Sequence, residues 1–565
     1  MSSPSSMSTS LNSLHLHPSS STTTMPQRRR TVVPFPIADD PDESTGGRTE
    51  LYWTPAELPA DHFLAQRPAG SNLTQPESQN SPDHDSWQRR ARPDTSSLAA
   101  ADYDVSVATG FLPPDEPVQR LQLGVEWQRF ERLLEMAQKE VSRLVGGGVG
   151  RLSESWRRHL RELPQPPIHE LTSLPLLRRA HVVLTYLAHF YTHAVYPYDT
   201  HVPATVSVPL VEISESLGLP PILTYADTVL WNWHLLDRSR GIQADNIVIT
   251  TTFTSSDSEK AFFFLSILCE LHGPIILRSM SSTLDEAFFA DRTALVRIAG
   301  HLDNIASALD ELALLLHDST RGAFGPAPVR ASISAPVFYW EIRPWFNGGR
   351  WMYESVGERE YGGPSAGQSS LVHAVDLFLG IDHSPRPAST TSTASVPASL
   401  GPEPSTTLPT PVAQAKGLSD DTFMMRMSTY MPGHHRAFLA HLASLYQPTE
   451  VSEAGIAEKL PSVRDLVIRH PQQLQESYDR AVLSMKKFRD EHMKLATVYI
   501  VAQAKKEPGR QTVFWQEWED KRIEKERLRQ EEARGRRDVL KGTGGTDLIV
   551  FLKMCRERTK EALLG

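Results

Sequence analysis

The sequence predicts an all-α protein with two folded domains. In most segments that are rich in apolar residues, these residues recur at helical spacing. The sequence indicates only one short pair of strands. A chain of 565 residues is also longer than a single hydrophobic core needs. We expect an N-terminal extension over 1–97, a small, mainly helical domain over 98–245, and a large helical domain whose two parts, 246–383 and 418–565, flank a low-complexity insert over 384–417.

The N-terminal extension and the insert lack the composition of a folded core. Both are rich in Ser, Thr and Pro, so burial cannot offset the entropy of ordering them, and only a short element near Leu51–Leu64 is indicated. The first 38 residues contain Arg28, Arg29 and Arg30 and no Asp or Glu, which is the composition of a mitochondrial transit peptide. Their prolines and their lack of amphipathic spacing favour a plain unstructured segment instead.

Helical spacing in the small domain predicts helices over Val118–Leu144 and Leu171–Tyr196. Two prolines then precede the apolar segment Ile222–Trp233, which we interpret as a helix or a buried turn. A short strand pair near Ile247–Phe253 follows, and we place the domain boundary there.

The large domain carries longer helical patterns, in which acidic residues alternate with Leu, Ala and Ile. Its predicted elements are helices over Lys260–Leu271 and Leu284–Leu316, a helix near His435–Tyr446, a long helix over Gln472–Ala504, a charged stretch over Glu517–Asp538 and a last helix from Asp547.

Composition excludes several classes of protein. The net charge is −9 and acids mix with bases along the chain, so no basic field attracts nucleic acid. Cys269 and Cys555 are the only cysteines, which excludes a disulfide scaffold and a cysteine-rich metal site and fits a reducing compartment. The apolar run Ala261–Leu268 is too short to cross a bilayer, and the N-terminus lacks the apolar core of a secretory signal. We expect a soluble, cytoplasmic monomer.

A histidine lies on the apolar stripe of the long predicted helix. The stripe runs through Leu474, Tyr478, Ala481, Met485, Phe488, His492, Leu495 and Tyr499, at alternating spacings of three and four. The pattern shows burial, and taken alone it favours a core histidine with a hydrogen bond over a metal ligand.

Eight separated segments resemble the indoleamine 2,3-dioxygenase family, in the order that the family has them. They are RRAHVVLTYLAHFY from Arg178, LGLPPILTYADTVLWNW from Leu217, KAFFFLSILCE from Lys260, FYWEIRPWFNGG from Phe338, SAGQSSLVHAVDLFLGI from Ser365, YMPGHHRAFL from Tyr430, RDEHMKLATVYI from Arg489 and GTGGTDLIVFLK from Gly542. The resemblance covers Ala99 to the C-terminus apart from the inserts, whose length is typical of a fungal-type member.

The resemblance implies a two-domain fold with haem b in the large domain and His492 as the single protein ligand of its iron. One axial imidazole leaves the sixth position for O₂. Arg489 lies one turn before His492, and Asp376 falls where the family has an aspartate near that arginine. We interpret the pair as a brace for the proximal side and a haem propionate; the alternative is a surface ion pair of little energetic value.

On the distal side, Phe262 and Ser266 are four residues apart and face one way on a helix. The resemblance assigns Phe262 to packing on the indole and Ser266 to a position near O₂ and the indole N–H. Tyr225 matches a further residue lining this pocket. Without the resemblance, aromatic core residues with a serine bonded to its own helix would be favoured.

Phe338, Tyr339 and Arg343 match the family's substrate-binding aromatic pair and its carboxylate-binding arginine. A guanidinium binds a carboxylate through two parallel hydrogen bonds, and aromatic faces bury an indole. Family members commonly have Phe where this chain has Tyr339, so substrate preference could differ. The resemblance thus assigns catalytic roles to Phe262, Ser266 and Arg343; an aromatic core strip is the alternative.

Two loops carry small residues. In SAGQSS, the side chains of Ser365, Ala366 and Gly367 are small enough for the backbone to approach a flat macrocycle, and the resemblance places this segment against the haem and the substrate. The segment lacks the G-x-S-x-G pattern of a nucleophile elbow, and without the resemblance it would be an ordinary tight loop. GTGGTD lacks the ending of a phosphate loop. The resemblance implies instead a lid that closes over the substrate, with Thr543 hydrogen-bonding the amino acid.

One further motif, the adjacent histidines His434 and His435, has no accompanying metal ligands in its segment. We interpret it as the start of a structural helix.

The function that the resemblance implies is insertion of O₂ across the indole C2–C3 bond of L-tryptophan, giving N-formylkynurenine, the first step of tryptophan breakdown by the kynurenine route that leads to NAD. An electron donor must keep the iron ferrous. Two alternatives stay open: a haem protein of this fold with another indole substrate or weak activity, and a non-catalytic haem-binding or partner-binding regulator.

Overall fold

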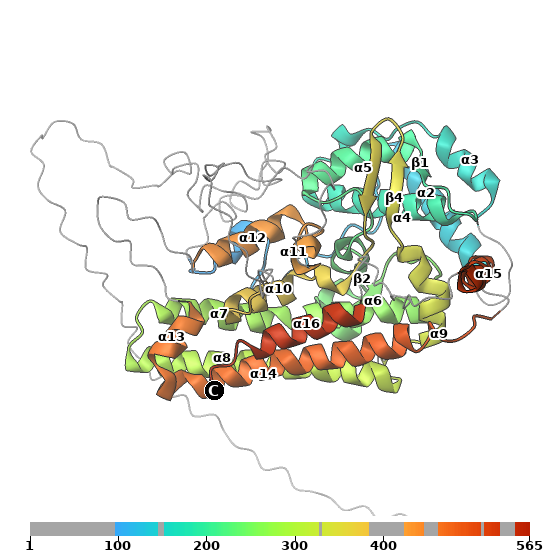
Figure 1. Ribbon diagram of the computed structural model, residues 1–565. Coiled ribbons are helices and arrows are strands. Elements are labelled where there is room, and N and C mark those ends of the chain that lie inside the picture. The colour runs from blue at the N-terminus through green and yellow to red at the C-terminus, as the bar shows by residue number, and fades with distance from the viewer. Residues whose placement is uncertain are drawn as a thin grey trace, which may run out of the picture. The chain divides into compact units, whose positions relative to one another are not determined.

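The computed structural model describes residues 96–144, 152–326, 330–383, 423–445, 462–509, 514–531 and 548–565 (Figure 1). The element predicted near Leu51–Leu64, the insert 384–417 and the loop with Thr543 lie outside these residues. Helices dominate the described residues, which confirms the all-α prediction. The division into a small and a large domain stays a prediction.

Helix α4 forms the core of the described residues before α6 (Asp257–Glu270), because nearly all of its side chains are buried. It and α2 confirm the two helices predicted here. Helix α5 was not predicted; it contains an internal proline, Pro209, which normally disfavours helix. The helical elements are η3 (Ala100–Tyr103), α2 (Val125–Leu144), α3 (Glu154–Glu162), η4 (Ile168–Glu170), α4 (Leu174–His193) and α5 (Ala204–Leu217), followed by the π-helical η5 (Ala226–Leu230) and the 3-10 turns η6 (Arg238–Arg240) and η7 (Ala244–Asn246).

Two small sheets accompany the helices. Strands β2 (Trp233–Leu235) and β3 (Ile247–Ile249) form an antiparallel pair. Only β3 lies in the range 247–253 that was predicted for a strand pair, because its partner comes from the preceding segment. The second sheet was not predicted: β4 (Gly349–Tyr353) and β5 (Gly357–Tyr361) form a hairpin, and β1 (His201–Val202) pairs in parallel with β4. The strand order is therefore β1-β4-β5.

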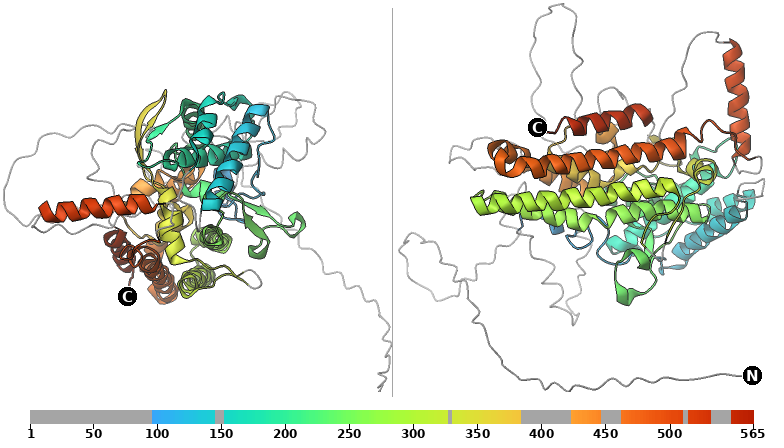
Figure 2. Two further views of the ribbon diagram at one scale, coloured as in Figure 1. Left: turned by 90° about the vertical axis from the view of Figure 1, so that its right-hand side faces the viewer. Right: turned by 90° about the horizontal axis from the view of Figure 1, so that it is seen from below.

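Long helices pack side by side in the described residues from Asp257 onward. Helix α14 (Pro471–Ala496) lies along α8 (Arg292–Arg321) and α16 (Leu548–Lys560), and α7 (Gly273–Ala287) lies along α8 (Figures 1 and 2). Helix α6 (Asp257–Glu270) precedes α7. Helix α6 carries Phe262 and Ser266 of the predicted site, and α14 carries Arg489 and His492.

The prediction of one helix over Leu284–Leu316 is wrong, because the chain turns between α7 and α8. Ala290 has a positive φ of 46°, and the Asp291 carboxylate accepts a hydrogen bond from the backbone N–H of Ala294 at 2.8 Å. This is an N-cap, so a new helix starts there.

The other elements complete the chain. They are α9 (Ala335–Val337), π-helical η8 (Phe338–Ile342), η9 (Arg343–Phe346), η10 (Ala366–Gln368), α10 (Ser370–Leu379), α11 (Phe423–Ser428), α12 (Gly433–Ser444), α13 (Val463–Arg469), π-helical η11 (Thr497–Val501) and α15 (Trp515–Glu531). The long helix predicted over Gln472–Ala504 corresponds to α14 followed by η11. The described part of the predicted charged stretch forms the helix α15.

One described helical stretch, Asp257–Ala287, is long and apolar enough to cross a membrane by these two criteria. It consists of α6 and α7, and 61% of its most apolar window is buried inside the protein.

Candidate active site

The buried stripe of α14 becomes accessible around His492. Along it, Leu474, Tyr478, Ala481, Met485 and Tyr499 are buried, whereas Phe488, His492 and Leu495 are only half-buried. Neither ring nitrogen of His492 has a hydrogen-bond partner among the described residues, so the core histidine satisfied by a hydrogen bond is not what the structure shows. Burial, and secondarily the charge of Arg489, lower the pKa of His492 to about 4. At neutral pH the ring is uncharged, which is the form that binds metal.

Helix α6 has an accessible stripe of its own. Phe262, Ser266 and Cys269 are half-buried, while the residues between them are buried. The Ser266 hydroxyl bonds neither to its own helix nor to any other described residue, so the alternative of a serine bonded to its helix does not hold. The stripe offers an aromatic face and a hydroxyl with free hydrogen-bonding capacity.

Ring contacts connect this stripe of α6 to η11, the helical turn that follows α14. The ring centroids of Phe262 and Phe338 are 4.6 Å apart, and those of Phe338 and Tyr499 are 5.9 Å apart. Tyr499 lies two turns after His492 on the same stripe. The structure therefore brings together two predicted substrate residues, and a third aromatic residue joins them to the helix of His492.

Arg343 and Tyr339 lie together where π-helical η8 passes into η9. The guanidinium carbon of Arg343 is 5.6 Å from the centre of the Tyr339 ring. Burial lowers the pKa of Arg343 and raises that of Tyr339. A π-helical turn often marks a functional site. Here it presents the guanidinium of a half-buried arginine beside an aromatic ring, an arrangement suited to an aromatic carboxylate ligand.

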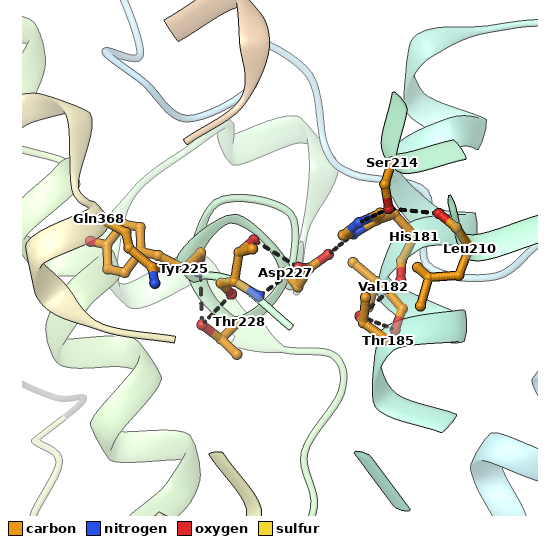
Figure 3. Close-up of polar contacts among 10 residues, drawn as sticks. His181, Val182, Thr185, Leu210, Ser214, Tyr225, Asp227, Thr228 and Gln368 are labelled. Carbon is orange, nitrogen blue, oxygen red and sulfur yellow. Dashed lines mark hydrogen bonds and ion pairs between the residues drawn. The ribbon is translucent and has the colours of Figure 1, made fainter. Parts of the chain in front are cut away.

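Tyr225 is held by groups from two other elements. Its backbone N–H donates to Oε1 of Gln368 at 2.8 Å, and Figure 3 shows the two residues together. Its hydroxyl donates to Oε1 of Glu270 at 2.9 Å, and the Ser369 hydroxyl donates to the same oxygen at 2.8 Å. Burial raises the pKa of Glu270 to about 7, although these two hydrogen bonds oppose the rise. Only the ring of Tyr225 is left to line a pocket.

Sequence reasoning missed Glu270 and Gln368. Glu270 follows Ser266 by four residues, so the helical period places both on one side of α6. An acid at the end of an apolar helix was the available signal. Its other oxygen, Oε2, is buried and has no hydrogen-bond partner among the described residues.

The SAGQSS segment forms a tight turn before α10. The Ser365 hydroxyl accepts a hydrogen bond from the Gly367 N–H at 3.2 Å, and the neighbouring Ala366 is exposed. A Cβ added at Gly367 would lie 2.9 Å from a ring carbon of Phe423 in α11. Glycine at 367 is therefore explained by packing against α11.

Arg489 and Asp376 form a buried ion pair. Nη2 of Arg489 lies 2.8 and 2.6 Å from the two carboxylate oxygens of Asp376, and Nη1 donates to the Thr559 hydroxyl in α16. The two charged side chains are only 7% and 4% exposed, so the alternative of a surface ion pair does not hold. The pair connects α14, α10 and α16.

The family model described as Indoleamine 2,3-dioxygenase matches residues 99–562. The chain belongs to the indoleamine 2,3-dioxygenase family. These enzymes are oxidoreductases, so the protein is an enzyme, and the non-catalytic reading is set aside.

Individual relatives cover most of the chain. It is 28% identical to Indoleamine 2,3-dioxygenase acdA of Aspergillus candidus over 82% of this chain and 98% of the relative. It is 28% identical to Indoleamine 2,3-dioxygenase 1 of Rattus norvegicus over 75% of this chain and 89% of the relative. A third relative is the 6-hydroxytryptophan 2,3-dioxygenase fscD of Fusarium equiseti, 26% identical over 82% of this chain and 97% of the relative.

This indoleamine 2,3-dioxygenase homologue also contains a buried Ser–His–Asp arrangement (Figure 3). Nδ1 of His181 lies 2.6 Å from Asp227, and its Nε2 lies 3.0 Å from the Ser214 hydroxyl. These side chains are fully buried, so no substrate reaches Ser214. The set ties α4 and α5 to η5, which directly follows Tyr225.

His434 and His435 lie in the first turn of the structural helix α12, as predicted. Burial lowers the pKa of His435 to about 3. No cluster of three or more His, Cys, Asp or Glu side chains that could hold a metal occurs in the described ranges. A metal carried by a single histidine of the chain, as in haem, lies outside that criterion.

The predicted site residues fall into four groups in the described structure. Phe262 contacts Phe338, Tyr339 contacts Arg343, and Arg489 pairs with Asp376. Tyr225 is linked through Glu270 to Ser369, next to the Ser365–Gly367 turn. No hydrogen bond or ring contact joins His492 directly to Phe262, Ser266 or Phe338 in these ranges, and Thr543 lies outside them.

Proposed function

We propose that the protein is a haem-dependent dioxygenase that inserts O₂ across the C2–C3 bond of L-tryptophan and gives N-formylkynurenine, with His492 as the proximal ligand of haem b. The observation that carries the proposal is His492 itself. Its imidazole is neutral at neutral pH, lacks a hydrogen-bond partner among the described residues and lies where a buried apolar stripe becomes accessible.

The residues present fit a haem group. Helices α14 and α6 each have an accessible apolar stretch between buried flanks, which suits a flat apolar ligand. A buried guanidinium, Arg489, lies one turn before His492 on the proximal helix. When bound, haem would supply the oxygen chemistry.

The chain's own residues would bind and orient the substrate. The contacting rings of Phe262 and Phe338 would pack against the indole, and the Arg343 guanidinium would bind the carboxylate. The free Ser266 hydroxyl would face the indole N–H. Closure of the glycine-rich loop around Thr543 would exclude water. No side chain is assigned as a general base.

The test is haem binding and product formation in wild type and His492→Ala. The proposal expects a Soret band in haem-reconstituted wild type, its loss or displacement in the variant, and N-formylkynurenine from ferrous wild type with O₂ and L-tryptophan. A Soret band without product would refute the tryptophan assignment, and no band at all would refute the haem assignment.

A second candidate substrate is a hydroxylated tryptophan. One relative is named a 6-hydroxytryptophan 2,3-dioxygenase. In this chain the Tyr339 hydroxyl has no hydrogen bond to the described residues and lies in the group with Arg343. A ratio of kcat/KM that favours 6-hydroxytryptophan over L-tryptophan would support this candidate, and a ratio that favours L-tryptophan would reject it.

We also propose a cytoplasmic monomer that relies on a separate electron donor to keep the iron ferrous. Both cysteines are free thiols, as a reducing compartment allows. Sedimentation of the purified protein and fractionation of cells test the two parts, and a dimer or a mitochondrial location would contradict them.

A further inference from the structure

His383 belongs to the buried group around Arg489. Its Nε2 lies 2.9 Å from Oδ2 of Asp376, the carboxylate that Arg489 binds. The side chain of His383 is 11% exposed, and that of Asp376 is 4% exposed. The side chains of Arg489, Asp376 and His383 come from α14, α10 and the segment after α10. They therefore lie together in one buried polar cluster.

The protonation of this group is fixed by Asp376. Burial opposes its ionisation, but the charge of Arg489 and the hydrogen bonds from His383 and Arg489 hold the pKa of Asp376 below its ordinary value. The carboxylate is therefore ionised, so Nε2 of His383 must carry a proton and donate it. Its other nitrogen, Nδ1, is buried and has no hydrogen-bond partner in the part of the chain that the structure describes. Buried polar atoms normally have partners, so this one indicates a missing ligand.

Among the described residues, the neighbouring polar side chains bond to other atoms or are uncharged. Arg489 balances Asp376, but its Nη1 and Nη2 already bond to Thr559 and Asp376. His373 lies on α10, as Asp376 does, and its Nε2 hydrogen-bonds to the backbone oxygen of Gly367 at 2.9 Å. Burial raises the pKa of the nearby Cys555 thiol to about 12, so that thiol is uncharged. Nδ1 of His383 is therefore a buried polar atom of this group that has no partner among the described residues.

We propose, resting on the haem binding proposed above, that Nδ1 of His383 donates a hydrogen bond to a haem propionate. The ring takes a proton from solvent as the haem binds and then bridges two carboxylates, with Nε2 on Asp376 and Nδ1 on the propionate. Arg489 and the imidazolium together balance both anions. His383 is thus a haem-binding residue.

The experiment compares wild type, His383→Gln and His383→Leu by the rate of haem transfer to excess apomyoglobin. The Gln amide can still donate to Asp376, but its second polar atom is an acceptor and cannot donate to a propionate. Leu loses both bonds. Each protein is loaded in parallel with protohaem and with its dimethyl ester, which has no charged carboxylate. His201→Gln is the control, because that side chain is 72% exposed.

We expect both His383 variants to release protohaem about tenfold faster than wild type, as befits one hydrogen bond to a charged group. With the dimethyl ester, wild type and His383→Gln should release at the same rate. His201→Gln should match wild type throughout, and thermal unfolding of haem-free His383→Gln should be unchanged.

Release of protohaem from His383→Gln at the wild-type rate would overturn the proposal. An effect of Leu alone would assign His383 only to supporting Asp376, which also overturns it. An equal effect of Gln on both haems would do the same. If wild type bound no haem, the proposed function would fail as well, so the two failures are distinguishable.

Discussion

Tyr225 donates a hydrogen bond to Oε1 of Glu270 over 2.9 Å. Ser369 donates to the same oxygen. One buried carboxyl therefore joins the end of α6 to the residue before η5 and to the turn before α10. These three places carry Ser266, the Tyr225 ring and the SAGQSS segment, so their relative positions depend on Glu270.

We predict that Glu270→Gln removes a pH dependence of stability. The pKa of Glu270 is about 7 in the folded protein and 4.5 ordinarily. Between these values the folded protein keeps a proton that the unfolded chain releases, so wild type loses stability as the pH rises from 4.5 through 7. The loss is on the order of 3 kcal/mol, because each pKa unit corresponds to about 1.4 kcal/mol.

Urea unfolding of haem-free wild type and variant at pH 5 and pH 8 measures the effect. The stability of Glu270→Gln relative to wild type should increase between the two pH values. The exposed Glu212→Gln is the control and should not change with pH relative to wild type. A constant difference between Glu270→Gln and wild type would show that the folded protein holds an ionised carboxylate.

A second prediction concerns the ion pair of Arg489 and Asp376. Asp376→Asn leaves a buried guanidinium without its counter-charge, which should lower the free energy of unfolding by about 3–5 kcal/mol. Replacing both partners, as in Asp376→Leu with Arg489→Met, should cost less than the single change. Urea unfolding of the haem-free proteins checks this order.

The exposed pair Arg350 and Glu360 provides the matched control, since its side chains are 67% and 51% exposed. Glu360→Gln should change the free energy of unfolding by less than about 1 kcal/mol. If Asp376→Asn were as mild as this control, the buried pair would not be holding α10 to α14.

The stripe that carries His492 could be predicted because it depends only on the helical period, but the pattern indicated burial and not the accessibility found around His492. The partner of Arg489 is 113 residues away, and no local pattern points to it; only the family resemblance located Asp376. Glu270 was found in neither way, because an acid at the end of an apolar helix does not by itself indicate burial. It is buried because Tyr225 and Ser369, 45 and 99 residues away, supply its donors.

The misses in the fold have the same origin. The β1 strand pairs with β4 about 150 residues later, and β5 has the sequence GEREY, whose charged residues hide a strand from an apolar pattern. The turn between α7 and α8 is set by the Asp291 cap, which interrupts an apolar spacing that continues on both sides. The spacing of apolar residues within one segment predicts a helix well. It does not predict which distant segment the helix or strand will contact.

A third prediction is that Ser214 is not a nucleophile despite its hydrogen bond to His181. A fluorophosphonate probe for active serines should not label the wild type, because Ser214 is only 1% exposed. Asp227→Ala should destabilise by about 1–3 kcal/mol, since His181 and the backbone N–H and hydroxyl of Thr224 lose their acceptor.

Ser214→Ala should retain dioxygenase activity, because the Ser214 hydroxyl bonds to His181 and the Leu210 carbonyl and not to any residue proposed to bind substrate. Labelling of wild type that disappears in Ser214→Ala would contradict the structural role. Unfolding measurements on Asp227→Ala separate lost stability from lost chemistry.

The last prediction concerns Tyr339→Phe. The Tyr339 hydroxyl has no hydrogen-bond partner among the described residues, and the benzene edge of L-tryptophan offers it none. Its removal should leave kcat/KM for L-tryptophan unchanged or a few-fold higher. For 6-hydroxytryptophan, where the hydroxyl can bond to the substrate, kcat/KM should fall about tenfold. Steady-state assays of both substrates with wild type and variant give the ratio, and Tyr361→Phe, outside the Arg343 group, is the control. A large loss on L-tryptophan would instead show that the Tyr339 hydroxyl binds the amino-acid end of the substrate beside Arg343, which would make Tyr339 part of carboxylate recognition.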